Sequence, residues 1–281
     1  MDTQTIGNDT IIYKVIRGPF DEKSCLQLID VMRSHADNSS IQTEALRILV
    51  QISAQAKDRK LLCKQILQQI LATSHLHPQD FDLQLNCCWL FINLAIEEAN
   101  RKVIIENAIS TMIAALSFSR GIVFVQVEML RVFIGFARYG AIQGPSAGET
   151  VDAVIATLRA HPDSEEIHSL ALLALAFLSA DPANKAAIAS RALDEAVACM
   201  RRHPAQPTIQ ARACQTVANT PLDPAEKHRV AIAALDPLLA AMRAHPAAPE
   251  TQIQACRALC NLTVDSAQAR RATMTLHYTY I

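Results

Sequence analysis

Hydrophobic residues along the chain recur at the three- and four-residue spacing of amphipathic helices. In residues 108–119, for example, Met112, Ile113 and Leu116 fall on one helical face, and residues 125–138 continue the same spacing. His-Pro dipeptides end several of these segments. Proline has no amide hydrogen and biases the preceding residue away from helix. The pattern therefore predicts helices joined by short turns.

The helical pattern repeats at a fixed step of 42 residues, which separates the dipeptides that begin at His161, His203 and His245. A largely glutamine column and a column of apolar type keep the same step. The first holds Gln42, Gln84, Gln126, His168, Gln210 and Gln252, and the second holds Leu46, Cys88, Leu130, Leu172, Cys214 and Cys256. Three independent columns with one step predict about six copies of one structural unit, each packed on its neighbours.

Each unit is expected to contain one short helix and two longer ones. In the third unit these are residues 101–107, 108–119 and 125–138. We expect a repeat domain over residues 21–265, an irregular N-terminal cap at 1–20, and an incomplete seventh unit or tail at 266–281. The six units span about 16–57, 58–99, 100–141, 142–183, 184–225 and 226–267.

Composition supports helices and limits the partners. Apolar residues make up 51% of the chain, and glycine occurs only 7 times, which favours helix over strand. A formal net charge of −1 argues against nucleic acid, since phosphate binding needs a concentrated basic surface. The longest apolar run, residues 170–180, is far shorter than the roughly 20 residues that span a bilayer. We therefore expect a cytoplasmic protein, or one that is also nuclear, with no membrane or nucleic-acid partner.

Candidate chemistry is sparse. The 8 cysteines include the adjacent pair Cys87 and Cys88 and the pair Cys256 and Cys260, but no Cys-x-x-Cys and no zinc spacing. The chain has no glycine-rich phosphate loop, no Gly-x-Ser-x-Gly and no His-Glu-x-x-His. The recurring histidines are interpreted as structural residues of the turns. The sequence thus predicts no enzyme, no cofactor and no metal.

One segment resembles a known family. Residues 86–94, Asn-Cys-Cys-Trp-Leu-Phe-Ile-Asn-Leu, resemble the third helix of armadillo repeats of the importin-alpha and beta-catenin type. In that family a Trp-x-x-x-Asn pair lines a concave groove, and the asparagine bonds the main chain of an extended peptide. Trp89 and Asn93 match this pair. The resemblance implies an all-α, right-handed α-solenoid of armadillo repeats, for which HEAT repeats are the nearest alternative.

Stepping from this motif by 42 residues gives three columns on one helix face, at positions i, i+3 and i+7. We predict that they line a partner-binding groove. The groove residues are Arg47, Gln51, Asn86, Trp89, Asn93, Arg131, Leu170, Leu173, Phe177, Arg212, Gln215, Asn219, Arg257 and Asn261. Glu44, Glu128 and Gln254 complete the columns, and Gly135 interrupts the asparagine column.

Two interpretations of this face remain open. An asparagine amide offers both a donor and an acceptor, so it suits a peptide main chain, but it also suits a cap or a bridge to a neighbouring repeat. The apolar trio Leu170, Leu173 and Phe177 fits an exposed contact site or additional core packing equally well.

The sequence predicts a non-catalytic scaffold or adaptor that holds an extended segment of another protein. The alternative is a regulator of a folded client, such as a small GTPase or a chaperone client, that uses the apolar middle with Arg131 and Arg257. Self-association through an uncapped C-terminal end is a further expectation, because residues 267–273 start a helix that no second helix follows.

Overall fold

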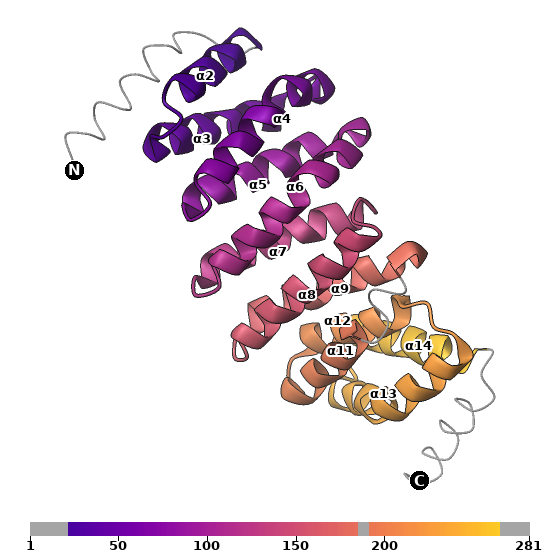
Figure 1. The fold of residues 1–281 in the computed structure, drawn as a ribbon. Coiled ribbons are helices and arrows are strands. Elements are labelled where there is room, and N and C mark those ends of the chain that lie inside the picture. Colours follow the sequence, from indigo (N-terminus) through magenta and orange to yellow (C-terminus); the bar gives the residue numbers. More distant parts are fainter. Residues whose placement is uncertain (1–21, 185–190, 265–281) are drawn as a thin grey trace, which may run out of the picture. The chain divides into compact units, whose positions relative to one another are not determined.

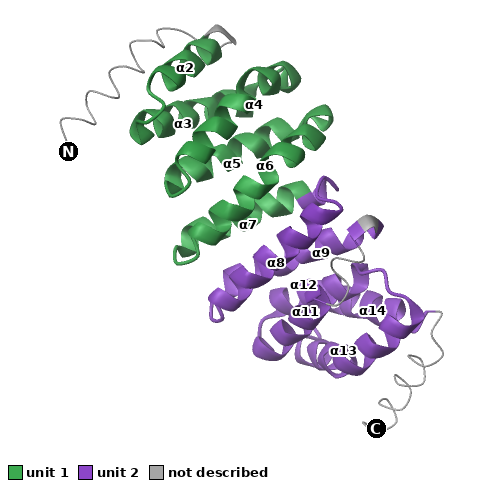
Figure 2. Cartoon of the chain, in the orientation of Figure 1, with its two compact units in different colours: residues 1–136 green, residues 137–281 purple. Residues whose placement is uncertain are grey.

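A computed structural model describes residues 22–184 and 191–264 of the chain, and in these ranges it contains twelve α-helices and no strand (Figure 1). The chain divides into two compact units, residues 1–136 and residues 137–281, here called unit 1 and unit 2 (Figure 2). The expectation of an all-α protein is confirmed.

In unit 1 the helices are α2 (Glu22–Ser34), α3 (Ser39–Gln55), α4 (Arg59–Leu76), α5 (Phe81–Ala95), α6 (Glu98–Phe118) and α7 (Val123–Arg138), the last of which runs past the boundary. Unit 2 contains α8 (Pro145–Ala160), α9 (Glu165–Ala180), a short 3-10 turn (Pro182–Asn184), α11 (Arg191–Arg202), α12 (Pro207–Asn219), α13 (Pro224–Ala244) and α14 (Pro249–Thr263). The expected cap at 1–20 and tail at 266–281 lie outside the described residues.

Consecutive helices form pairs, and the second helices of the pairs begin at Ser39, Phe81, Val123, Glu165, Pro207 and Pro249, a constant step of 42 residues. Within unit 1, α3 packs on α5 and α4 packs on both α2 and α6. Within unit 2, α12 packs on α9 and α14, and α11 packs on α8 and α13. We call α3, α5, α7, α9, α12 and α14 the second-helix layer, and their preceding partners the first-helix layer. The protein is therefore built from α-helical repeats.

The repeat unit is a helix pair in the parts that the structure describes, not the expected trio. Residues 101–107 and 108–119 do not form two helices, because α6 is continuous from Glu98 to Phe118. No glycine or proline interrupts it, and Asn107 donates from Nδ2 to the carbonyl of Val103 at 2.7 Å without ending the helix. Helix α4 is likewise continuous, and so is α13 despite its internal Pro237.

The glutamine column closes the C-terminal ends of the first helices. Gln84 is buried, and its Nε2 donates to the carbonyls of Ser74 at 2.7 Å and His77 at 2.9 Å. These carbonyls belong to the last turn of α4 and to its cap, where intrahelical donors are missing. The same paired bonds are made by Gln42, Gln210 and Gln252, and Gln126 bonds the Leu116 carbonyl and the Ser119 hydroxyl.

His168 replaces glutamine in the fourth repeat and changes the contacts there. Its ring is fully buried, and its Nδ1 lies 2.9 Å from Nε2 of His203 and 3.7 Å from Sγ of Cys199. The two imidazoles meet edge to face, with centroids 4.5 Å apart. Elsewhere the recurring histidine bonds the previous repeat, as when Nε2 of His245 donates to the Pro204 carbonyl at 2.8 Å.

Both imidazoles favour the neutral form. Burial lowers the pKa of His168, and the nearby His203 and Arg202 lower it further, while backbone carbonyls oppose the shift. Burial also lowers the pKa of His203, with Arg202 adding to the effect and nearby carboxylates opposing it. Protonating one ring would leave a charge that burial disfavours, and protonating both would set two N–H groups against each other.

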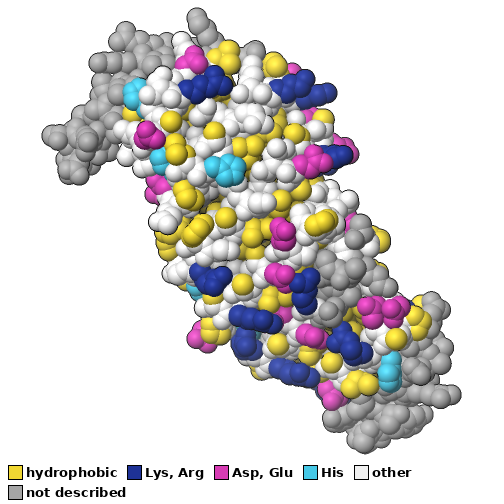
Figure 3. All heavy atoms as spheres, in the orientation of Figure 1, with side chains coloured by type: hydrophobic (Ala, Val, Ile, Leu, Met, Phe, Trp, Pro, Cys, Tyr) yellow, Lys and Arg dark blue, Asp and Glu magenta, His cyan; other side chains and the backbone are white. Residues whose placement is uncertain are grey.

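Ion pairs join the first helices of unit 2 across their surface. Arg159 of α8 pairs with Glu195 of α11 at 3.1 Å, and Arg229 of α13 pairs with Asp194 of α11 at 3.1 Å. Figure 3 shows basic and acidic side chains side by side over this unit. Exposed pairs contribute little, typically up to about 1 kcal/mol each. In each pair, nevertheless, the carboxylate offsets the positive charge of the arginine.

Arg201 compensates for the proline inside α13. Because Pro237 has no amide hydrogen, the carbonyl of Ala233, four residues earlier, loses its usual helical donor. The Nη2 atom of Arg201 on α11 donates to this carbonyl at 3.1 Å. The neighbouring helix thus supplies the hydrogen bond that the α13 backbone lacks.

Arg201→Ala should therefore lower the free energy of unfolding by about 0.5–1.5 kcal/mol, the usual net worth of one hydrogen bond. In a Pro237→Ala background the cost should shrink, because the alanine amide restores the helical donor to Ala233. Urea denaturation of the four proteins of this double-mutant cycle measures the coupling. Arg229→Ala, which removes an exposed ion pair on the same helix, is the control and should show no coupling to residue 237.

His168→Gln should flatten the dependence of stability on pH. The folded pKa values of His168 and His203 lie below the unfolded value of about 6.5, so the unfolded chain binds protons more readily. Their contribution is fully present above pH 6.5 and is lost as the pH falls toward the folded values. Urea midpoints between pH 5 and 8 should fall with acidity in the wild type and less in the variant. Equal slopes in both proteins would contradict this account.

Candidate protein-binding face

Asn93, the matched asparagine of the family motif, bridges two neighbouring repeats. Its Nδ2 donates to the carbonyl of Val50 at 3.2 Å and to the hydroxyl of Ser53 at 2.9 Å, both in the last turns of α3. The side chain stays half-buried on α5. Its donor group is therefore used inside the protein, as the bridging interpretation of the sequence expects.

The two asparagines of unit 2 are held in the same way. Nδ2 of Asn219 on α12 donates to the Ala176 carbonyl of α9 at 3.0 Å. Nδ2 of Asn261 on α14 donates to the carbonyls of Val217 and Thr220 at 2.9 Å each. The three asparagines thus fix α5, α12 and α14 to the end of the preceding second helix.

The amide oxygens of these residues are used less than the nitrogens. Oδ1 of Asn219 accepts from Nη2 of Arg257 at 3.2 Å. Among the residues that the structure describes, no hydrogen bond is made to Oδ1 of Asn93 or of Asn261. Since the nitrogens hold the side chains in place, these two oxygens are acceptors in fixed positions on a partly exposed face.

Three arginines of the face, Arg47, Arg131 and Arg257, are exposed, and each pairs with the side chain three positions earlier in its helix. Nε of Arg47 donates to Glu44 at 2.8 Å, Arg131 pairs with Glu128, and Nη1 of Arg257 donates to Gln254 at 2.8 Å. Glu128 and Gln254 are buried, although the sequence placed them on the exposed face. In each of these two pairs a buried acceptor holds the arginine above it.

The remaining face residues are at least partly exposed. In unit 1, Gln51 is exposed, Trp89 is half-buried, and Asn86 donates to its own helix backbone at 2.8 Å. In unit 2, Arg212 donates to Gln215 at 3.1 Å. All fourteen groove residues named from the sequence are therefore accessible on the second-helix layer of their own unit.

The apolar trio of α9 is also partly accessible. Leu170, Leu173 and Phe177 are each half-buried, whereas Leu172, Leu175 and Leu178 on the opposite side are buried. The trio lies at i, i+3 and i+7 of one helix, so its side chains share one face. It packs partly in the protein and leaves an apolar strip on unit 2.

Another set of repeat-spanning contacts was missed by the sequence reasoning. Nδ2 of Asn100 donates to the Arg59 carbonyl at 2.9 Å, and Nδ2 of Asn184 donates to the Ile142 carbonyl at 2.9 Å. The two asparagines stand two periods apart, so stepping by 42 residues from either would have found the other. Both are buried, which assigns them to holding repeats together rather than to a partner.

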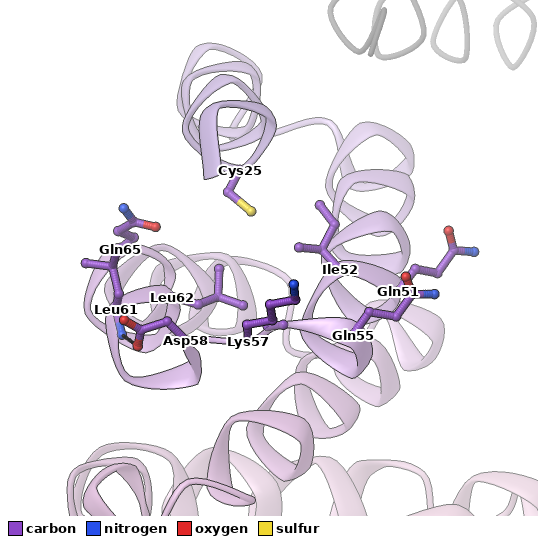
Figure 4. Close-up of a pocket in the computed structure, with 10 residues that line it drawn as sticks. Cys25, Gln51, Ile52, Gln55, Lys57, Asp58, Leu61, Leu62 and Gln65 are labelled. Atoms are coloured by element: carbon purple, nitrogen blue, oxygen red, sulfur yellow. Dashed lines mark hydrogen bonds between the residues drawn. The ribbon is translucent and has the colours of Figure 1, made fainter. Parts of the chain in front are cut away.

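A cavity of about 440 Å³ lies at the α2 end of unit 1 (Figure 4). Cys25 of α2, Ile52 of α3 and Leu62 of α4 line it. Gln51 and Asp58 also line it, and they stand one period before Asn93 and Asn100, the residues that reach back to the preceding repeat. The cavity therefore lies on the surface of the first described helix pair that, in later pairs, contacts the preceding repeat. Its lining residues present no acid–base pair suited to catalysis.

The buried thiols are poor nucleophiles. Burial raises the pKa of Cys63 to about 11 and the pKa values of Cys88, Cys199 and Cys214 to about 12. Burial, with the adjacent Cys88, also raises the pKa of Cys87 well above its usual range. Because the thiolate is the reactive form, these side chains act as small apolar core residues.

Within residues 22–184 and 191–264, no group of three or more histidine, cysteine, aspartate or glutamate side chains is arranged to hold a metal ion. In the same ranges no helix is both long enough and apolar enough to cross a bilayer.

Comparison with known proteins bears on the fold alone. No family model and no curated protein matches the sequence. A crystal structure of an engineered protein from the Northeast Structural Genomics Consortium is similar, with a TM-score of 0.59 at 18% identity over 86% of this chain and 97% of that chain. Together with the helix pairs described above, this likeness supports an all-α fold of helical repeats.

Proposed function

We propose that the protein is a non-catalytic scaffold or adaptor that holds a segment of another protein on its second-helix layer. The observation that carries this proposal is the pair of amide oxygens on Asn93 and Asn261, fixed in place and without an internal donor among the described residues. An acceptor that is already oriented loses little entropy when a peptide N–H binds to it. Cytoplasmic or nuclear location goes with this proposal, which involves no cofactor and no nucleic acid.

We assign the repeats to the armadillo class within this proposal. The 42-residue period and the Trp89/Asn93 pair support that assignment. Two helices per repeat, with α4, α6 and α13 each continuous, are instead typical of HEAT repeats, which stay the alternative. Both classes use one layer of helices as an extended binding surface, so the proposed function is the same for either.

A second candidate function rests on α9. The half-exposed Leu170, Leu173 and Phe177 form an apolar strip of the kind that anchors a folded partner. A regulator of a folded client, such as a small GTPase or a chaperone client, would use this strip together with Arg131 and Arg257. Self-association is a further option for the C-terminal end, which lies outside the described residues.

Substitutions should separate the internal role of the asparagines from binding. Asn93→Ala and Asn261→Ala should each lower the free energy of unfolding by about 0.5–1.5 kcal/mol per lost hydrogen bond, because the Nδ2 donors vanish. Trp89→Ala removes a half-buried ring, and Arg131→Glu sets a second carboxylate beside the buried Glu128, so both should also lower the urea midpoint. Measured on the folded proteins, both should weaken the partner several-fold.

The partner for this test is obtained by affinity purification with the full chain and mass spectrometry, and its affinity is then measured by calorimetry. Lys102→Glu on α6, an exposed site of the first-helix layer, is the matched control and should bind like the wild type. If Trp89→Ala and Arg131→Glu both bind with unchanged affinity, the second-helix layer of unit 1 is not the binding face.

Hydrogen exchange should distinguish the two candidate functions. A peptide held on the second-helix layer of unit 1 should protect the amides of α5, which carries Asn93, and one held on that of unit 2 should protect the amides of α14, which carries Asn261. A folded client on the apolar strip should instead protect α9, and Phe177→Ser should then cost more affinity than Asn93→Ala. Protection confined to the first-helix layer would exclude both functions.

A further inference from the structure

The turn between α6 and α7 has an apolar residue at the position just before the second helix. In three of the equivalent turns a polar side chain caps the helix there, because Asn38, Asp80 and Ser164 accept hydrogen bonds from the amides of Ile41, Leu83 and Ile167, whereas Gln206 and Ala248 make no such bond. The third repeat has Ile122 there, and its carbonyl accepts the first helical bond from Gln126 at 3.1 Å. Isoleucine cannot cap, so this helix forgoes a favourable interaction.

The same turn exposes large apolar side chains. Ile122, Val123 and Phe124 are 39%, 47% and 64% exposed. The position of Phe124 is polar in every other repeat, where it holds Ser40, Asp82, Glu166, Thr208 and Glu250. The fold therefore does not require an aromatic residue at this position, and an exposed apolar cluster of this kind marks a contact site.

Ile122 and Phe124 line a groove of about 770 Å³ between two neighbouring turns of unit 1. Figure 1 shows the α4–α5 and α6–α7 turns on the same side of this unit. Apolar walls come from Leu76, Phe81, Ile122 and Phe124. We call this site the rim groove, because it lies at the turns and not on the second-helix face.

The charge at the rim groove is acidic. Asp80 and Asp82 both line it, and none of its lining residues is lysine or arginine, although Arg120 stands in the same α6–α7 turn. Asp80 is engaged as the cap of α5, whereas Asp82 is exposed at the groove edge. A ligand with an apolar anchor and a neighbouring positive charge matches these walls, since a cation gains from both carboxylates.

We infer that the rim groove binds a short segment of a partner protein that carries an aromatic or aliphatic anchor next to lysine or arginine. Phe124 and Ile122 pack against the anchor, and Asp82 pairs with the cation. This site is separate from the proposed binding face, because none of its lining residues belongs to the asparagine and arginine columns. Its binding is therefore independent of Asn93 and Arg131.

A random dodecapeptide library displayed on phage, selected on the full chain, tests this inference. Enriched peptides should combine an aromatic or aliphatic residue with lysine or arginine, and synthetic copies should bind with affinities measurable by fluorescence anisotropy. Phe124→Ser and Asp82→Lys should each weaken the peptides at least tenfold. Ile232→Ser, which changes an equally exposed aliphatic residue of α13, is the matched control and should leave binding unchanged.

Ile122→Asn separates loss of binding from loss of folding. Asparagine restores the cap found at Asn38, so this variant should raise the thermal midpoint while it weakens the peptides at least fivefold. Arg131→Glu should bind them like the wild type, which keeps failure of this site distinct from failure of the proposed face.

Two results would overturn the inference. One is a set of enriched peptides without basic residues, or with affinities that Phe124→Ser leaves unchanged. The other is a concentration-dependent dimer in sedimentation velocity that Phe124→Ser abolishes, since the groove would then hold a second copy of this chain.

Discussion

Stacked helix pairs bury the C-terminal ends of their helices, and the carbonyls at those ends need donors. In this protein side-chain amides supply them. The glutamine column closes the first helix of each pair from within the repeat, as Gln84 does for Ser74 and His77. In three repeats an asparagine closes the preceding second helix from the following repeat, as Asn261 does for Val217 and Thr220. An unsatisfied buried carbonyl costs about 1–3 kcal/mol, so these bonds stabilise the helix ends that they reach.

The same constraint explains the exceptions. Where histidine takes the glutamine position, His203 turns to His168 instead of reaching the previous repeat as His245 does. Where proline removes a helical donor in α13, Arg201 replaces it from α11. At both positions a neighbouring side chain supplies a compensating contact. The α6–α7 turn is different, because its apolar residues Ile122, Val123 and Phe124 stay exposed.

This difference separates structure from function in a repeat protein. Residues that keep the 42-residue step and are buried hold the stack together, and Gln42 and Asn100 are of this kind. Residues of the face columns that stay accessible, such as Arg131 and Arg257, belong to the proposed binding face. Surface residues that differ in type from their equivalents 42 residues away, such as Phe124, give one repeat a surface property that the others lack. Asn93 belongs to two of these groups, since its nitrogen serves the fold and its oxygen faces outward.

The amino-acid sequence by itself determined the helical class and the period of 42 residues. These follow from local spacing, because apolar periodicity and turn residues act within a few positions along the chain. It also located the accessible face, since exposure follows helix periodicity. The continuity of α6 was beyond it, because burial against α4 and α5 favours one helix where the local pattern suggested two.

Only the tertiary structure decided which atoms remain available on that face. The sequence names an asparagine, but whether its amide meets a peptide or a neighbouring carbonyl depends on the distance between repeats. The Asn93 nitrogen donates to the end of α3 in the preceding repeat, so only the amide oxygen stays without a hydrogen bond among the described residues. The rim groove likewise appears only when two turns 42 residues apart in sequence are brought side by side. The sequence specifies which donors and acceptors are present, whereas contacts between repeats decide which of them are hydrogen-bonded inside the protein.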